Sequence, residues 1–135
     1  MSRRLLFGKS KRLHRRRDFQ RVFAARCSVA DRYLVVYVAP NGLGHSRLGI
    51  PVGRKFGNAV RRNRVKRLIR EAFRIEQWDL LPGFDIICIP RPGDLGDQQQ
   101  YRQSIRRLTA AAAKRSTRGP GALPAETGGA DSQGT

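Results

Sequence analysis

The longest predicted helix in the chain is NAVRRNRVKRLIREAFRIE, residues 58–76, and the other segments are best understood from it outward. Asn58 is a good N-cap residue, because its side-chain oxygen can accept a backbone N–H of the first turn. Apolar residues recur on one side at helical spacing and cover an arc of roughly 140°. They are Val65, Leu68, Ile69, Ala72 and Phe73. We therefore expect this side of the helix to pack on a sheet.

The remaining surface of this helix, with the loop before it, is strongly basic. Nine Arg and Lys residues lie within 54–74, and Glu71 and Glu76 are the acids that oppose them. Opposite the apolar stripe lie Asn63, Arg67, Arg70 and Arg74, with Arg64 and Lys66 on its flanks. A solvated charged face normally alternates signs, because oppositely charged i,i+4 pairs stabilise a helix. This face repels itself instead and predicts an anionic ligand, for which guanidinium groups are well suited.

Five further segments have the spacing or composition of regular structure. Helical spacing of apolar residues predicts helices over 14–26 and 97–114. β-Branched, aromatic and alternating apolar residues predict strands over 33–39, 46–53 and 84–89. The last strand is nearly continuous in apolar residues and is expected at the centre of the sheet.

The order of these elements indicates the fold class. A short extra strand near Ser28–Ala30 is weakly signalled, and with it the order becomes αβββαβα. We predict a single α+β domain in which helices pack on one mixed, mostly antiparallel sheet. Pro51 removes one donor from its predicted strand, so that position should face an edge or a bulge.

The ends of the chain differ from the middle in composition. Residues 1–13 are basic and irregular and are expected to form a flexible arm, whereas residues 14–115 form the domain. Residues 116–135 are dominated by small residues and proline, which predicts a disordered low-complexity tail. No apolar run approaches the roughly 18–20 residues of a membrane helix, and no signal peptide is visible. We expect a cytoplasmic protein that does not associate with a membrane.

Net charge is the strongest global property of the sequence. The 135 residues contain 28 Lys and Arg against 10 Asp and Glu, a formal net charge of +18. Solubility of a small domain needs only about 2–8 charges, so this excess predicts a polyanionic partner. Nucleic acid is favoured, because each phosphate contact releases condensed counterions. Eleven of the cations lie in residues 1–32 and nine in 54–74, so the positive charge is concentrated in two parts of the chain.

Side-chain catalysis and metal binding find little support in the sequence. No nucleophile, metalloprotease or phosphate-loop motif is present, and the ten acids form no compact cluster by spacing. Cys27 and Cys88 are far apart, and Cys88 lies within an apolar run where a buried role is expected. His14 and His45 have no ligand spacing, so a zinc site is not expected. We predict no catalytic residue and no metal bound by the protein.

Several stretches resemble the bacterial ribonuclease P protein family. Residues 58–74 resemble its RNR motif, and residues 47–57 resemble the strand that leads into the RNR helix. Residues 18–23 and 33–37 resemble the first helix and first long strand of that family. Phe84–Ile89 and Tyr101–Leu108 fall where its last strand and helix belong, so the resemblance covers about residues 9–115.

The resemblance implies a fold and a function. The fold is shared with a ribosomal-protein domain and contains an unusual left-handed βαβ crossover through the RNR helix, whereas most such crossovers are right-handed. The family's protein binds a large catalytic RNA, and the ribonucleoprotein removes the 5′ leader from precursor tRNA. The implied partners are therefore this RNA and precursor tRNA. Hydrolysis is expected in the RNA with Mg²⁺, so the chain is an endoribonuclease subunit without a cofactor of its own, monomeric within the ribonucleoprotein.

Site residues follow from the motif and from the basic stretch around it. The predicted RNA-binding residues are Arg54, Lys55, Asn58, Arg61, Arg62, Asn63, Arg64, Lys66, Arg67 and Arg70. Phe19, Phe23 and Tyr37 match the cleft that the family uses for the single-stranded leader. Aromatic rings stack on unpaired bases with little sequence preference, although helical spacing also favours core packing for Phe19 or Phe23. Pro51 and Gly53 replace the small hydroxyl residues common in the family, which puts contacts by those hydroxyls in doubt.

Two other functions fit the same charge. A ribosomal protein of similar fold would also bind structured RNA, and it would associate stably with ribosomal subunits. A nucleoid DNA-binding protein would bind duplex DNA, but the sequence shows neither a recognition-helix arrangement nor a dimer seam.

Overall fold

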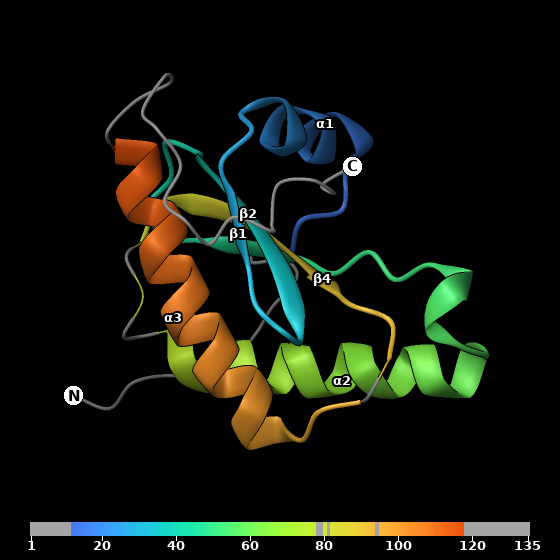
Figure 1. The fold of residues 1–135 in the computed structure, drawn as a ribbon. Coiled ribbons are helices and arrows are strands. Elements are labelled where there is room, and N and C mark those ends of the chain that lie inside the picture. The colour runs from blue at the N-terminus through green and yellow to red at the C-terminus, as the bar shows by residue number, and fades with distance from the viewer. Residues whose placement is uncertain (1–11, 78–79, 81, 94, 118–135) are drawn as a thin grey trace.

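The computed structural model describes residues 12–77, 80, 82–93 and 95–117. Its elements, shown in Figure 1, are α1 (Arg16–Ala24), β1 (Ser28–Ala30), β2 (Leu34–Pro40), β3 (Arg47–Gly49), the 3-10 helix η2 (Arg54–Phe56), α2 (Ala59–Glu76), β4 (Phe84–Pro90) and α3 (Gln98–Thr117). The predicted order of helices and strands is confirmed, including the short strand β1.

The four strands form one mixed sheet in the order β1-β2-β4-β3. The pairs β1–β2 and β2–β4 are antiparallel, whereas β3 and β4 are parallel. Helix α2 is therefore the crossover between two adjacent parallel strands. Strand β4 lies inside the sheet, as its continuous apolar run predicts. The left-handed sense of the crossover stays a prediction of the resemblance.

Strand β3 is shorter than the predicted strand over 46–53. It pairs with β4 only through Arg47–Gly49, and the chain has left the sheet by Pro51, which has no N–H to donate. Leu13 is buried and donates its backbone N–H to the Leu48 carbonyl oxygen at 2.8 Å. Arg12 forms a parallel bridge with Leu48. These two residues therefore belong to the fold, which corrects the predicted arm over 1–13 at its end; residues 1–11 lie outside the described residues.

Helix α3 extends two residues into the predicted tail, because the structure keeps it helical to Thr117. Ala110–Ala113 favour the extension because alanine has the best intrinsic helix propensity, and Lys114 and Arg115 favour it because cations stabilise the C-terminal end of a helix. The remainder of the predicted tail, residues 118–135, lies outside the described residues.

Each face of the sheet has its own hydrophobic core. The larger core joins the sheet to α2 and α3, and it includes Val65, Ile69, Phe73, Ile105 and Cys88. The smaller core joins the other face to α1 through Leu13, Val22, Tyr37, Ala39 and Ile87. Figure 1 shows α2 and α3 crossing each other, with α1 apart from both. Helix α1 therefore depends on a small packed area and on its polar contacts.

Two sequence expectations concern the described part of the chain as a whole. None of its helices is both long and apolar enough to cross a lipid bilayer. Cys27 and Cys88 are buried free thiols, and burial raises the pKa of Cys88 to about 12. The predicted core role of Cys88 is confirmed.

Candidate RNA-binding surface

The loop before α2 is built to begin the helix at one position. Phe56 of η2 is buried and anchors the loop, and the Asn58 side-chain oxygen accepts the backbone N–H of Arg61 at 2.9 Å. Gly57 has a φ of +146°, and a Cβ added there would lie 2.5 Å from Cδ of Arg61. The predicted N-cap is thus confirmed, and Gly57 is required for the turn into α2.

Along α2, the predicted division into an apolar side and a basic face is confirmed. Val65, Ile69 and Phe73 are buried, whereas Asn63, Arg64 and Arg67 are exposed. Lys66 and Arg70 are half-buried. We call Asn63, Arg64, Lys66, Arg67 and Arg70 the basic face of α2. Arg54 and Lys55 are exposed in the preceding 3-10 helix and extend this surface.

Two predicted RNA-binding arginines make contacts within the protein. Arg61 donates from Nε to the Phe56 carbonyl at 3.0 Å and from Nη2 to the Gly93 carbonyl. Its guanidinium also lies over the Phe56 ring, 5.0 Å from the centroid. Arg62 donates from Nε to the Gly57 carbonyl at 3.2 Å. The structure thus uses Arg61 to join three segments around the start of α2, whereas Arg64 and Arg67 of the basic face are exposed.

A groove of about 330 Å³ borders the basic face. It lies between α1, β3 and the middle of α2, so residues far apart in the sequence meet there. Its lining comprises Arg12, Leu13, His14, Phe19, Leu48, Gly49, Ile50, Pro51, Lys66 and Arg70. Cationic groups and apolar surface therefore share one concavity, which suits a ligand with phosphates and exposed bases.

The cations of this groove lie close enough to influence one another. Burial lowers the pKa of Arg70, and the positive charge of Arg12 lowers it further. An arginine stays protonated after such a shift, so the groove retains like charges at short range. Binding an anion there would relieve this repulsion and replace the lost hydration.

Phe19 lies in the groove because β3 has a glycine beneath it. A Cβ added to Gly49 would lie 2.6 Å from Cζ and 2.8 Å from Cε1 of Phe19. The ring therefore rests against the bare backbone of β3, where it is half-buried. The ring also packs against the smaller core, and its partly exposed portion lines the groove.

Phe23 and Tyr37 lie elsewhere, and the prediction for Tyr37 is corrected. The two rings meet edge to face, with centroids 4.8 Å apart and planes at 77°. Tyr37 is 6% exposed and belongs to the smaller core, so it offers no face for a base to stack on. Phe23 is half-buried against that core and is not among the residues that line the groove. The alternating pattern of β2 did not indicate that α1 would cover the ring of Tyr37.

We expect Gly49→Ala to displace the Phe19 ring from β3. The backbone of Gly49 is not in the left-handed region, so the added methyl group acts by overpacking, at a cost of about 1 kcal/mol. Urea denaturation should show this loss, and NOEs between the Phe19 ring and residue 49 should change. Gly53→Ala is the matched control, because a Cβ there meets nothing within 4 Å. An unchanged Phe19 ring environment in Gly49→Ala would contradict the packing described above.

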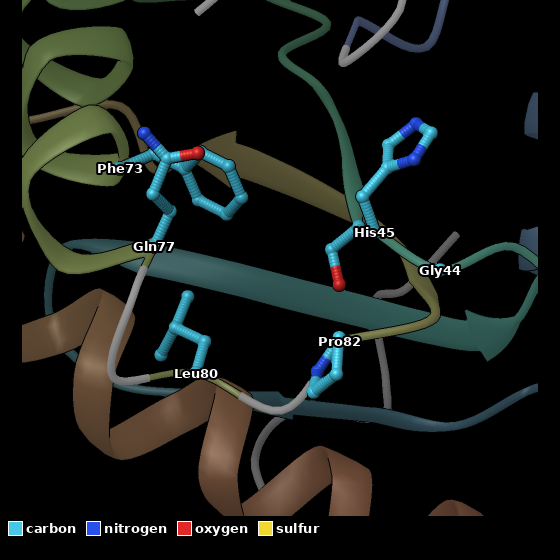
Figure 2. Close-up of a pocket in the computed structure, with 7 residues that line it drawn as sticks. Gly44, His45, Phe73, Gln77, Leu80 and Pro82 are labelled. Atoms are coloured by element: carbon cyan, nitrogen blue, oxygen red, sulfur yellow. The ribbon is translucent and has the colours of Figure 1, made fainter. Parts of the chain in front are cut away.

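A second hollow, of about 210 Å³, has different chemistry. Its lining comprises Gly44, His45, Ser46, Phe73, Gln77, Leu80 and Pro82. Figure 2 shows Phe73 of α2 and Gln77, the residue after that helix, across this hollow from His45 and Pro82. The lining residues contain no Arg or Lys. This hollow therefore lacks the positive charge that makes the groove beside α1 suitable for binding nucleic acid.

Comparison with known proteins decides the family. A family model described as Ribonuclease P matches residues 7–113. The chain belongs to the ribonuclease P protein family. It is 49% identical over 85 residues to the ribonuclease P protein component of Thermotoga petrophila, covering 63% of this chain and 73% of the relative. It is 41% identical over 93 residues to that of Natranaerobius thermophilus, covering 68% and 81%.

Solved ribonuclease P proteins have the same fold. The structure of a Staphylococcus aureus RNase P protein mutant with defective mRNA degradation activity aligns with a TM-score of 0.70 at 38% identity. That alignment covers 78% of this chain and 90% of the other. The Thermotoga maritima RNase P protein aligns with a TM-score of 0.65 at 40% identity, covering 72% and 96%.

Two buried carboxylates of this ribonuclease P protein have roles that the sequence did not reveal. The side chains of Asp85 of β4 and Glu76 of α2 are almost completely buried. Each carboxylate contacts two arginines from other elements. Asp85 interrupts an apolar strand, which is a signal that such a residue has a partner. The sequence gives a weaker signal for Glu76. Arg102 and Arg106 have i,i+4 spacing on α3, but this spacing identifies them as partners of Glu76 only once α3 is known to lie beside α2.

Proposed function

We propose that this chain is the protein subunit of ribonuclease P and assists removal of the 5′ leader from precursor tRNA. The observation that carries the proposal is the adjacency of the basic face of α2 to the groove that holds Phe19. Lys66 and Arg70 belong to both, so a structured RNA on α2 and a single strand in the groove would be bound side by side.

Each half of this surface suits one partner. Arg64 and Arg67 are exposed on a rigid helix, and guanidinium groups bind the phosphates of a folded RNA in fork-like geometry. The groove combines cations with one accessible aromatic ring, which suits the unpaired leader. We assign the catalytic RNA to the basic face of α2, with Arg54 and Lys55, and the leader to the groove.

We place the hydrolysis in the RNA subunit, with Mg²⁺ supplied there. The described carboxylates support this division, because they make structural contacts. Asp18, Asp31, Glu71, Glu76 and Asp85 each form an ion pair with an arginine, and Asp97 accepts the backbone N–H of Gln100. We further propose that the protein acts in the cytoplasm and that one copy of it enters the ribonucleoprotein.

Reconstitution with the ribonuclease P RNA from the same source tests this function. The protein alone should leave precursor tRNA intact, and the RNA alone at low Mg²⁺ should cleave slowly. Adding the protein should restore cleavage at low Mg²⁺, because its cations neutralise phosphates that metal ions would otherwise have to neutralise. The assay measures mature 5′ ends on a denaturing gel over a titration of Mg²⁺.

Three results would contradict the proposal. Cleavage by the protein without RNA would place the reaction in the chain itself. Stable co-sedimentation with ribosomal subunits, without stimulation of the RNA, would favour a ribosomal protein of similar fold. Equal affinity for duplex DNA and the cognate RNA at physiological salt would favour a DNA-binding protein.

A further inference from the structure

The carboxylate of Asp85 lies buried between the sheet and α1, where both of its oxygens accept hydrogen bonds. Oδ1 accepts from Nε of Arg47 at 2.7 Å and from Nδ2 of Asn41 at 2.9 Å. Oδ2 accepts from Nη2 of Arg47 at 2.6 Å and from Nη2 of Arg21. The Asp85 side chain is 0% exposed. A buried charge of this kind is tolerated only when its partners are fixed in place.

These contacts extend into a chain of alternating charges that begins and ends on α1. Asp18 of α1 lies 3.7 Å from Arg47 of β3, Arg47 contacts Asp85 of β4, and Asp85 contacts Arg21 of α1. Arg21 also donates to the Pro40 carbonyl at the end of β2, at 2.9 Å. We call Asp18, Arg21, Asn41, Arg47 and Asp85 the Asp85 network. It joins α1 to three of the four strands.

Ionised Asp85 is the centre of this network. Burial alone would raise the pKa of Asp85, but the hydrogen bonds from Arg47 and Asn41 and the charges of Arg47 and Arg21 lower it below its ordinary value. The carboxylate therefore carries its charge at neutral pH and attracts both arginines.

The network lies beside the groove. Arg47 and Gly49 are two residues apart on β3, so their side-chain positions share one face of the strand. Arg47 contacts Asp18, and Gly49 supports the ring of Phe19, the next residue of α1. Helix α1 has nine residues and no side-chain N-cap hydrogen bond, so it is too short to be stable alone. Its orientation therefore depends on its smaller core and on the Asp85 network.

We propose that Asp85 is a positioning residue for leader binding, which holds α1 so that Phe19 faces Lys66 and Arg70 across the groove. This inference rests on the proposed function, in which the groove takes the single-stranded leader. Asp85 itself does not line the groove. Its effect passes through Arg21 and Arg47 to the helix that carries Phe19.

Asp85→Asn tests the inference, because it keeps the shape of the side chain and removes the charge. Binding is measured with the reconstituted ribonucleoprotein and two precursor tRNAs, one with a leader too short to reach the groove and one with a long leader. We expect Kd for the long-leader substrate to rise about tenfold and Kd for the short-leader substrate to stay within twofold. Phe19→Ala should cause a similar loss, and the double variant should be no worse than Phe19→Ala alone, since both changes act on one contact.

Glu76→Gln is the matched control. Glu76 is also a buried carboxylate that accepts hydrogen bonds from two arginines, but it lies between α2 and α3 and does not line the groove. It should lower stability without changing the preference for the long leader. If Asp85→Asn fails to fold, Arg21→Ala replaces it, because the Arg21 side chain is 42% exposed and its loss leaves Arg47 on Asp85.

The outcomes separate the inference from the function on which it rests. A wild-type ribonucleoprotein that binds both substrates equally would overturn the groove as a leader site, and the inference with it. A wild-type preference for the long leader that Asp85→Asn and Arg21→Ala retain would overturn the inference alone. Equal loss on both substrates, or the same loss in Glu76→Gln, would show that Asp85 only stabilises the fold.

Discussion

Replacing Arg64 and Arg67 together with alanine is expected to weaken binding of the cognate ribonuclease P RNA by about 20- to 60-fold at 0.1 M salt. Both side chains are exposed on α2. If each contacts one phosphate, each loss reduces the slope of log K against log salt by about 0.7–0.9. The double variant should therefore have a salt dependence flatter by about 1.4–1.8. Filter binding over a series of salt concentrations measures both quantities.

A double variant of α3, Arg107→Ala with Lys114→Ala, is the matched control for charge. It also removes two positive charges, but from α3, whose C-terminal end lies far from the start of α2 in Figure 1. Its affinity at high salt and its slope should remain close to those of the wild type. Equal slopes for the wild type and the Arg64/Arg67 variant would mean that these two arginines face solvent in the complex.

Local sequence was sufficient to predict α2, because every signal for it lies within the helix or one turn away. Asn58 accepts the N–H of Arg61, three residues on, and Val65, Ile69 and Phe73 recur at the helical period. The exposure of Arg64 and Arg67 follows from the same periodicity, because both residues lie off the apolar stripe. These parts of the candidate site required no knowledge of the rest of the chain.

The groove could not be predicted in the same way, because it forms where three elements meet. The Phe19 ring can lie against β3 because Gly49, from another element, offers no side chain beneath it. Tyr37 is covered because α1 packs on that face of β2 and places Phe23 against it. The alternation of side chains along β2 predicts that the strand has two faces, but it does not predict which face a short helix will cover. The family resemblance supplied the cleft, and the packing decides which aromatic residue lies in it.

The ion pairs were beyond sequence analysis for a related reason. Glu76 is one of two acids assigned to the basic helix, and the sequence suggested only that it offset local charge. In the structure it is 1% exposed and accepts hydrogen bonds from Nε of Arg102 at 2.8 Å and Nη2 of Arg106 at 2.8 Å. Partners 26 and 30 residues away become neighbours only after α2 and α3 have packed. The excess of arginine therefore has a structural as well as an RNA-binding use.

Removing both partners of Glu76, in Arg102→Ala with Arg106→Ala, should lower the free energy of unfolding by about 3–5 kcal/mol at neutral pH. The change leaves an ionised carboxylate buried between two helices without compensation. Urea denaturation measures the loss. Arg107→Ala with Lys114→Ala again serves as control, because the Arg107 side chain is 64% exposed and its ion pair with Asp31 contributes only about 0–1 kcal/mol.

The difference in free energy of unfolding between the wild type and the Arg102/Arg106 variant should shrink as the solution is acidified. Burial raises the pKa of wild-type Glu76, but hydrogen bonds and charges from Arg102 and Arg106 lower it below the ordinary value of 4.5. The stability that ionised Glu76 contributes is therefore present above about pH 4.5 and is lost as the pH falls through the folded-state pKa. In the variant, burial is the influence on Glu76 that remains. The pKa of Glu76 therefore rises, and its carboxyl group becomes neutral at a higher pH than in the wild type. A stability difference that stayed constant from neutral pH to below pH 4 would show that the arginines stabilise the α2–α3 interface by packing, and not by charge.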